Sequence, residues 1–339
     1  MEKKSILLVH TGDAAFVELD KKFLSVYHDV SEINATKPFP LGFLRYWRGI
    51  AQSHLLFCWF ASWNSFWAIM LSKIFRIPSV LIIGGYDLAN LPEIKYGHQR
   101  RVLMRPISRL AMRMATHLSC FSNFSKTEAQ RNAHIPPSRL DVNYLGIPDV
   151  FKLKTDPIKE NIVLTVANVN RDNLKRKGLE LFVQTAALVP GMKFILVGKW
   201  MDDAIDILRG LAGGKVTFTG QISDEQLQVY FQQAKYYVQA SRHEGFGMSL
   251  AQAMLARCIP IVSDVGSIPE VVGDCGIYIK KCEPEYIAAA IRSVSDNSDI
   301  GERARDWILR KFPPEKRIED LHCLIDSALH HTGQKTACQ

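Results

Sequence analysis

The sequence predicts an α/β protein made of two doubly wound domains that face each other across a cleft. Three observations lead to this prediction. The chain has 339 residues, which is enough for two domains of ordinary size. Short apolar runs alternate with helical segments, as in parallel sheets covered by helices. The alternation restarts after a proline-containing stretch, Asp149 to Lys159, which we interpret as a linker.

Residues 1–150 are expected to form the N-terminal domain. Its strands are expected at 5–9, 55–59, 79–83, 117–121 and 142–145, and its helices at 14–26, 63–75, 98–115 and 125–132. A dinucleotide-binding turn would need the pattern GxGxxG after the first strand. Only Gly12 stands there, so we expect no NAD-type site.

The composition favours a cytoplasmic protein. The seven cysteines form no CxxC pair, which suits a reducing compartment. Met1 to Lys4 run directly into the first strand, so no signal peptide is expected. The stretch between Arg48 and Lys73 lacks charged residues, but polar residues interrupt it. A strand followed by a helix is therefore favoured over a membrane span.

One acidic residue of the first half stands where parallel sheets bind ligands. Gly84-Gly85-Tyr86-Asp87 follows the strand over residues 79–83, at its carboxyl end. Asp87 is therefore expected to face the cleft. Two roles stay open for it: contact with an acceptor or sugar, and capping of its own loop.

Positive charge is concentrated in the first half of the chain. Residues 1–149 carry 18 Lys and Arg against 11 Asp and Glu, a net charge of +7, whereas residues 150–339 carry 24 against 23. Four arginines recur every fourth residue in the helix expected over 98–115, and Pro106 is expected to kink or split that helix. These arginines are Arg101, Arg105, Arg109 and Arg113. A solvated face and a contact with anionic lipid or a phosphate-bearing acceptor both remain open.

Residues 151–312 are expected to form the C-terminal domain. Its strands are expected at 162–166, 193–197, 216–219, 236–239 and 259–263, with helices at 179–188, 204–211 and 224–233 between them. The run Asp202-Asp203 is interpreted as a helix start. Residues 313–339 are expected to form a helix that crosses back to the first domain, followed by a tail.

The stretch over residues 241–254, SRHEGFGMSLAQAM, has the most specific pattern in the chain. Glycines between a strand and a helix let backbone amides approach a ligand, and the start of a helix favours an anion. The amides of Gly247, Met248 and Ser249 are therefore candidates for binding a diphosphate. Glu244 precedes the helix, and Gln252 lies about a turn and a half into it. These polar groups fit the hydroxyls of a sugar nucleotide.

This stretch resembles the signature of the retaining glycosyltransferases of the GT-B fold, the large family 4. The resemblance implies two Rossmann-like domains and the transfer of a sugar from a nucleoside diphosphate to an acceptor. In that family, a glutamate at the position of Glu244 contacts the donor sugar. A second glutamate eight positions later holds the ribose, and Gln252 departs from the pattern there. An amide offers one acceptor oxygen where a carboxylate offers two.

The resemblance also covers the run RDNLKRKG at residues 171–178. In the family, an arginine and a lysine at the positions of Arg171 and Lys177 bind the donor diphosphate. Two fixed cations would stabilise the charge that develops on the leaving nucleotide. A UDP- or GDP-sugar is therefore the expected donor. In the family, the loop after the first strand often faces the cleft, so the resemblance also makes Gly12 a candidate donor-binding residue. Because the cations and the helix amides supply positive charge, no metal is expected to be required.

The sequence thus predicts a hexosyltransferase in the synthesis of cell-surface polysaccharide or glycolipid. Its acceptor would be a glycan or a lipid-linked sugar, bound by the first domain, and the enzyme would lie in the cytoplasm or on the inner face of the membrane. Glu244, Lys177, Arg171 and Asp87 are the candidate catalytic residues. Two alternatives remain: a transferase-like binding subunit weakened by Gln252, and a nucleotide-sugar epimerase. Nucleic acid is not expected as a partner, because the basic residues form no recognised motif.

Overall fold

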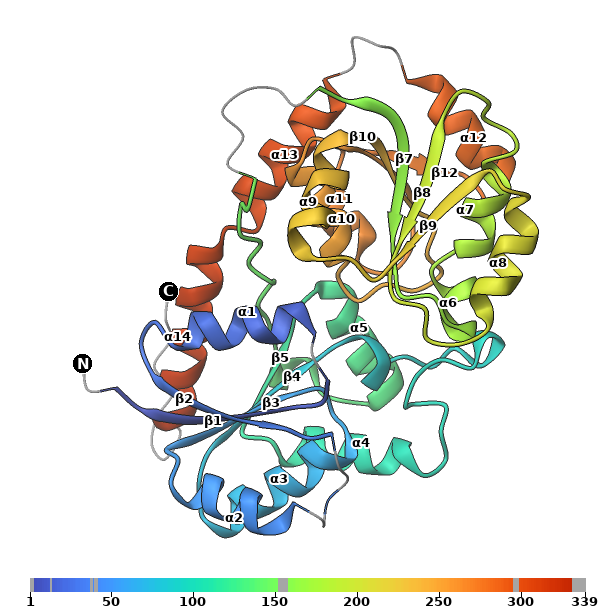
Figure 1. Ribbon diagram of the computed structural model, residues 1–339. Coiled ribbons are helices and arrows are strands. Elements are labelled where there is room, and N and C mark those ends of the chain that lie inside the picture. Colours follow the sequence, from blue (N-terminus) through green and yellow to red (C-terminus); the bar gives the residue numbers. More distant parts are fainter. Residues whose placement is uncertain are drawn as a thin grey trace. The chain divides into compact units, whose positions relative to one another are not determined.

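The structure is a computed structural model that describes residues 3–12, 14–36, 39, 42–151, 158–294 and 299–330. The chain divides into two compact units (Figure 1). Unit 1 contains Met1–Gly146 and Pro314–Gln339, and unit 2 contains Ile147–Pro313. The boundaries expected at residues 150 and 312 lie close to these two points. Residues 152–157 of the expected linker and residues 331–339 of the expected tail lie outside the described residues.

Unit 1 is built on a six-stranded parallel sheet with the strand order β2-β1-β3-β4-β5-β6. All residues of β3 and β4 are buried, because helices cover both faces of the sheet. The elements in chain order are β1 (Ser5–His10), α1 (Ala15–Leu24), β2 (Asp29–Asn34), α2 (Phe43–Ala51), β3 (Leu55–Trp59), α3 (Trp63–Ile74), β4 (Ser79–Ile83), the 3-10 turns η1 (Gly85–Asp87) and η2 (Pro92–Ile94), α4 (Met104–Met114), β5 (His117–Cys120), α5 (Asn123–Ala133), η3 (Pro137–Arg139), β6 (Leu140–Val142) and α14 (Pro314–His330).

Unit 2 repeats this plan with the strand order β12-β11-β10-β7-β8-β9, again with parallel pairing. Its elements are β7 (Glu160–Val166), α6 (Arg171–Arg176), α7 (Leu179–Thr185), β8 (Lys193–Val197), α8 (Ala204–Ala212), β9 (Val216–Gly220), α9 (Asp224–Gln233), β10 (Ala234–Gln239), α10 (Met248–Leu255), β11 (Ile259–Ser263), α11 (Ile268–Val272), β12 (Ile277–Ile279), α12 (Pro284–Ser293) and α13 (Ile300–Lys311). The two doubly wound sheets predicted from the sequence are confirmed.

In both sheets, the chain first adds strands on one side of the first strand of the unit and then on its other side. The first strand of unit 2, β7, lies between β8 and β10, and the first strand of unit 1, β1, lies between β2 and β3. The carboxyl ends of strands at such a change of side are the usual ligand-binding edge of an open α/β sheet. Residues that follow β7 and β10, or that end β1, are therefore placed at ligand-binding edges.

The last helix, α14, belongs to unit 1, where it packs against α1, β3 and β4. Arg317 of α14 is fully buried and forms a bidentate ion pair with Asp20 of α1, with N–O distances of 3.0 and 2.6 Å. It also donates to the carbonyl of Asn143 at 2.8 Å. Gly146 passes so close that a Cβ there would lie 2.8 Å from the Cβ of Arg317. A side chain at this position would push the helix away.

The helix expected over residues 98–115 is shorter in the structure. It begins at Met104, and Pro106 lies in its first turn. Because amides of the first turn have no partner inside a helix, proline is accepted there without a kink. The predicted kink is therefore wrong. Arg101 precedes the helix, so the four arginines do not all share one helical face. Across the described residues, every helix is too short or too polar to cross a bilayer.

Candidate active site

The centre of the candidate site in unit 2 is an ion pair between Lys177 and Glu244. Lys177 follows the last residue of α6, and Glu244 lies in the loop between β10 and α10. The ammonium contacts Oε2 of Glu244, and the amide of Gln239 donates to the same oxygen at 3.0 Å. Side-chain exposure is 21% for Lys177 and 11% for Glu244, so the pair lies mostly out of water. The structure thus brings together two of the residues that the sequence singled out.

In both members of this pair, the charge of the partner opposes the effect of burial. Burial is the largest influence on Lys177 and lowers its pKa, although the charge of Glu244 acts in the opposite direction. Burial alone would raise the pKa of Glu244, but the charges of Lys177 and Arg176, with the hydrogen bond from Lys177, lower it below its usual value. Glu244 is therefore an ionised carboxylate at neutral pH.

Glycine allows α6 and α7 to approach the loop after β10. Gly178 follows Lys177 with a φ of +67°, and a Cβ there would lie 2.2 Å from the carbonyl oxygen of Ala240. One further bond holds the two segments, from the amide of Arg242 to the carbonyl of Arg176 at 2.7 Å. No side chain fits between the segments at Gly178, so the glycine is what lets Lys177 reach Glu244.

The backbone of Glu244 is held by a loop that the sequence analysis did not single out. The amide and the hydroxyl of Ser267 both donate to the carbonyl of Glu244, at 3.0 and 3.1 Å. Gly266 has a φ of +64°, and a Cβ there would lie 2.5 Å from that same carbonyl oxygen. Together with Gln239, these residues fix the carboxylate in place. The sequence contains only two weak signals of this arrangement. One is the pair Gly266-Ser267 after β11, and the other is the polar residue Gln239 at the end of the apolar strand β10.

Helix α10 begins beside Glu244, at Gly247, whose φ is +98°. Most of this helix is buried, but Met248, Ser249 and Gln252 are only partly buried. The hydroxyl of Ser249 forms a hydrogen bond with Tyr237 of β10, whose pKa is raised mainly by burial. The residues of α10 that reach solvent are therefore the ones that were predicted to bind the donor.

Arg171 is placed differently from Lys177. It is the first residue of α6, its side chain is 62% exposed, and its guanidinium forms a bidentate pair with Asp203. Its backbone amide donates to Asp202 at 3.0 Å. Asp203 directly precedes α8, and the amide of Ala204, the first residue of α8, donates to Asp202 at 2.9 Å. The Asp202-Asp203 run is therefore a helix start, as expected from the sequence. Hydrogen bonding within the pair raises the pKa of Arg171 and lowers that of Asp203. A diphosphate that bound Arg171 would compete with Asp203.

The two predicted residues of unit 1, Asp87 and Gly12, both take part in hydrogen bonds within unit 1. Asp87 is buried and accepts from the amides of Ala61 and Gly84 at 3.0 and 3.1 Å. Burial raises the pKa of Asp87 to about 7, against the effect of these amides. It therefore caps the turn after β4, and a contact with an acceptor stays a prediction. Gly12 has a φ of +81°, and its amide donates to the side chain of Asn34 at 3.2 Å.

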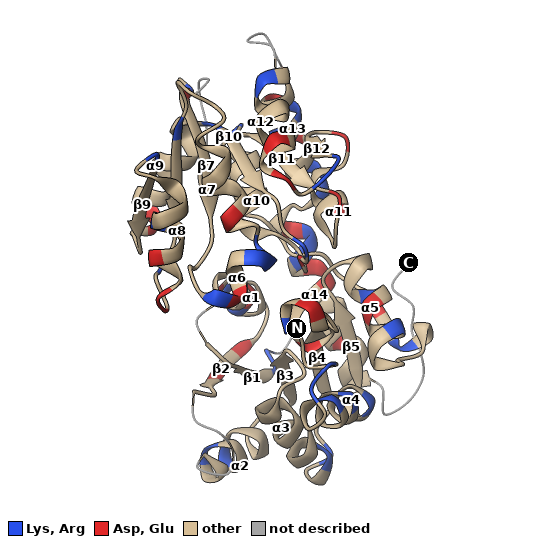
Figure 2. Cartoon of the chain, turned by 90° about the vertical axis from the view of Figure 1, so that its right-hand side faces the viewer, with Lys and Arg blue, Asp and Glu red and all other residues tan. Residues whose placement is uncertain are grey.

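The predicted arginines of α4 divide into two kinds. Arg109 is partly buried and donates to Gln99 and to the carbonyl of Asn132, at 3.0 and 2.6 Å. Arg101, Arg105 and Arg113 are exposed. Figure 2 shows positions of Lys or Arg in blue at α4. A shallow pocket runs along this helix and is lined by Val102, Arg105, Pro106, Arg109, Leu110 and Arg113. Arg109 therefore holds unit 1 together, while the other three face solvent.

Comparisons with known proteins show what this chain is similar to. The profile of the family described as glycosyl transferases group 1 matches residues 160–297. The chain is 33% identical over 268 residues to a GDP-mannose:cellobiosyl-diphosphopolyprenol alpha-mannosyltransferase of Xanthomonas campestris, a match that covers 67% of this chain and 70% of that protein. It is 32% identical over 133 residues to the O-antigen chain mannosyltransferase B of Escherichia coli, covering 36% of this chain and 35% of that protein.

Among solved structures, HepE of Anabaena in complex with UDP and glucose is similar, with a TM-score of 0.77 and 18% identity. The similarity covers 96% of this chain and all of that chain. The sucrose-phosphate synthase of Thermosynechococcus elongatus has a TM-score of 0.74 at 16% identity, with 98% and 100% covered. At these identities the likeness concerns the fold, and the predicted GT-B fold is confirmed.

Proposed function

Because the chain belongs to the group 1 glycosyl transferases and is a glycosyltransferase, we propose that it moves mannose from GDP-mannose to a glycan built on a lipid diphosphate, with retention of configuration. Its role in polysaccharide or glycolipid synthesis follows from the relatives as a group. The mannose, the guanine nucleotide and the diphosphate lipid are taken from the names of the Xanthomonas relatives. The observation that carries the proposal is the buried Lys177–Glu244 pair beside the start of α10.

In this proposal, unit 2 binds the donor. The leaving diphosphate gains negative charge as the glycosidic bond breaks, and that charge must be stabilised where it develops. The ammonium of Lys177 and the amides of Gly247, Met248 and Ser249 supply fixed positive charge, so the reaction requires no metal there. Glu244, which is held by Lys177 and Gln239, accepts hydrogen bonds from the hydroxyls of the sugar. Unit 1 binds the acceptor.

A panel of donors tests the proposal. GDP-mannose, UDP-glucose and UDP-N-acetylglucosamine are each added to the protein while the melting temperature is followed, since a tight ligand stabilises the folded state by mass action. GDP-mannose is expected to give the largest rise, and a larger rise with a UDP-sugar would contradict the proposed donor. Transfer is then measured on lipid-diphosphate acceptors. Binding without transfer would favour the binding-subunit alternative, and an isomerised donor without acceptor would favour the epimerase.

Replacing Gln252 by glutamate is expected to tighten the binding of GDP-mannose. A carboxylate accepts from both ribose hydroxyls through charged hydrogen bonds, which are stronger than neutral ones by about 1 kcal/mol, or roughly five-fold in affinity. Calorimetric titration measures the difference. Gln228→Glu in α9 is the matched control, since that glutamine is also partly buried. An unchanged dissociation constant for Gln252→Glu would show that this side chain does not contact the ribose.

Removing the charge of Asp203 is expected to strengthen donor binding modestly. Arg171 is paired with Asp203, so binding of a diphosphate to Arg171 must displace that carboxylate. Because exposed ion pairs are weak, Asp203→Asn should lower the dissociation constant for GDP-mannose by less than about five-fold. Asp206→Asn, on the same helix, serves as control. A weaker affinity in Asp203→Asn would mean that the pair itself orders Arg171 for the donor.

A lipid-linked acceptor would bring the enzyme to a membrane surface, and the segment from Arg101 to Arg105, where α4 begins, has suitable chemistry for one. Val102 and Leu103 are 76% and 79% exposed, and they stand next to Arg101 and Arg105. Apolar side chains that enter the interface, together with arginines near anionic headgroups, produce peripheral binding. We propose this surface as the membrane contact.

Vesicle sedimentation tests the membrane contact. The double variant Arg105→Glu, Arg113→Glu is expected to lose more than ten-fold of its binding to phosphatidylglycerol vesicles, at about 1 kcal/mol for each basic residue. Arg131→Glu on α5, which is also exposed, should bind as the wild type does. Equal binding of the wild type to neutral phosphatidylcholine vesicles would contradict an electrostatic contact.

A further inference from the structure

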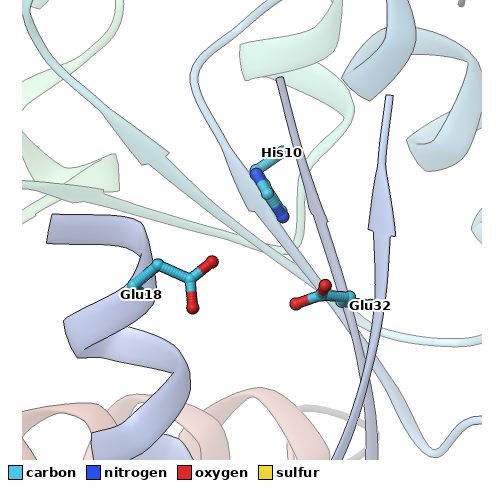
Figure 3. Close-up of side chains that lie close together, drawn as sticks. All are labelled: His10, Glu18 and Glu32. Atoms are coloured by element: carbon cyan, nitrogen blue, oxygen red, sulfur yellow. The ribbon is translucent and has the colours of Figure 1, made fainter. Parts of the chain in front are cut away.

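A histidine and two glutamates meet in unit 1, whereas Lys177, Glu244 and α10 belong to unit 2. His10 is the last residue of β1, Glu18 lies in the first turn of α1, and Glu32 lies in β2. One nitrogen of His10 and one oxygen from each glutamate all lie within 4.8 Å of one another. Figure 3 shows the imidazole ring directed toward the gap between the two carboxylates.

The sheet register explains why these residues meet. Leu8 pairs with Glu32 and His10 pairs with Asn34 in the parallel β1–β2 ladder. Because side chains alternate between faces, His10 and Glu32 lie on the same face, as diagonal neighbours. Helix α1 contributes Glu18 from its first turn. Three different elements therefore converge at the carboxyl end of β1, which is a ligand-binding edge.

The hydrogen bonds of His10 select the tautomer that a metal requires. Nδ1 lies 2.9 Å from the carbonyl oxygen of Gly12, and a carbonyl can only accept. Nδ1 therefore carries the proton, and in the neutral ring Nε2 presents a lone pair. This arrangement, in which one ring nitrogen donates to a backbone carbonyl and the other is available, is usual for metal-binding histidines.

Nε2 of His10 lacks a hydrogen-bond partner among the described residues, although the residue is only 3% exposed. A buried polar atom without a partner is costly. Here its lone pair also faces two carboxylates, and three groups rich in electrons repel one another unless a cation stands between them. The cluster therefore lacks a positive charge at its centre.

One cation already lies near the edge of the cluster. The ammonium of Lys21 pairs with Glu32, and this hydrogen bond is the main reason that the pKa of Glu32 is lowered. Arg45 donates to the backbone carbonyl of Glu32 at 3.2 Å. Lys21 balances the negative charge of Glu32, but it does not provide a hydrogen-bond partner for Nε2 of His10. It would compete with any ion for the carboxylate of Glu32.

We propose that His10, Glu18 and Glu32 bind a divalent transition-metal ion of the Zn²⁺ class. Zinc bonds to histidine nitrogen and carboxylate oxygen are about 2.0 to 2.2 Å long, so ligand atoms around one ion lie up to about 4 Å apart. The side chain of Glu18 is exposed and can close the remaining gap by changing rotamer. The imidazole favours Zn²⁺ over Mg²⁺, which prefers oxygen ligands. The ion would tie α1 to β1 and β2.

Calorimetric titration of the metal-stripped protein with Zn²⁺, Mn²⁺ and Mg²⁺ tests the proposal. We expect one Zn²⁺ per chain, weaker Mn²⁺ and no Mg²⁺ binding at micromolar concentration. At an ion concentration about a hundred times the dissociation constant, the melting temperature should rise by roughly 5 °C or more. The absence of Zn²⁺ binding up to about 1 mM would overturn the proposal and leave a proton on Nε2 as the compensating charge.

Variants locate the ion. Glu18→Gln changes an exposed side chain and is expected to keep the fold while weakening Zn²⁺ binding at least ten-fold, as should His10→Gln. The controls Glu93→Gln and His134→Gln change exposed residues elsewhere in unit 1 and should bind as the wild type does. Lys21→Met should bind Zn²⁺ more tightly, because the competing ammonium is gone. Wild-type affinity in both Glu18→Gln and His10→Gln, or weaker binding in Lys21→Met, would refute the site.

Discussion

Replacing Lys177 with alanine is expected to reduce glycosyl transfer by about 10²- to 10³-fold or more. The ammonium is the cation closest to Glu244 in unit 2, and the proposal assigns to it the charge that develops on the leaving nucleotide. The loss should fall mainly on kcat, since the interaction strengthens as the bond to the diphosphate breaks. Steady-state kinetics with GDP-mannose and a lipid-diphosphate acceptor measure the change.

The same substitution has a structural effect that must be separated from catalysis. Among the described residues, the amide of Gln239 is then the one side chain that still donates a hydrogen bond to the buried carboxylate of Glu244. Removing one partner of a buried pair costs about 3 kcal/mol or more in the free energy of unfolding. Urea unfolding measures this loss, and Lys175→Ala, in the same helix but exposed, is the matched control. If folded Lys177→Ala turned over almost as fast as the wild type, the assignment of the phosphate contact would be wrong.

The substitution Arg317→Met is expected to destabilise unit 1 by roughly 3 to 5 kcal/mol. The methionine fills much of the space but leaves the carboxylate of Asp20 buried and unpaired, and the carbonyl of Asn143 loses a donor. Unfolding in urea, followed by tryptophan fluorescence, gives the change in free energy. Lys316→Met, one residue earlier and exposed, should change stability by less than 1 kcal/mol, as surface substitutions of about this kind do.

A double variant distinguishes the ion pair from packing. Replacing Asp20 with leucine in the Arg317→Met background removes the orphaned charge, and buried pairs replaced by apolar residues are often no less stable. Most of the lost stability should then return. If the double variant were as unstable as the single one, the helix would be held by shape complementarity, and the charges would contribute little.

Much of the fold could be predicted because parallel strands buried on both faces are continuous apolar runs. The residues of β3 and β4 are of this kind, and they were located within one residue of their ends. The start of α4 was missed because periodicity alone continues across Pro106, whereas the helix begins at the turn in which that proline is tolerated. Helix ends depend on backbone bonds that the side-chain pattern does not report.

The candidate site could be predicted only in part, since its contacts join distant segments. Lys177 and Glu244 were each identified by resemblance, but their pairing spans 67 positions and becomes visible only in three dimensions. Asp203 was interpreted correctly as part of a helix start. Its second role, as the ion-pair partner of Arg171, could not be predicted, because it depends on how the loops after β7 and β8 meet. The His10 cluster carries no local motif at all, because its three residues come from three elements.

The attachment of α14 has a consequence for how the protein is made. Residues 1–146 leave the ribosome long before α14 has been synthesised, because Asp20 is separated from its partner Arg317 by 297 positions. Until α14 has been synthesised, the nascent sheet of unit 1 lacks the helix that covers part of β3 and β4. Exposed apolar surface of this kind attracts chaperones and promotes aggregation. The N-terminal unit can therefore be completed only after the whole of the C-terminal unit has been synthesised.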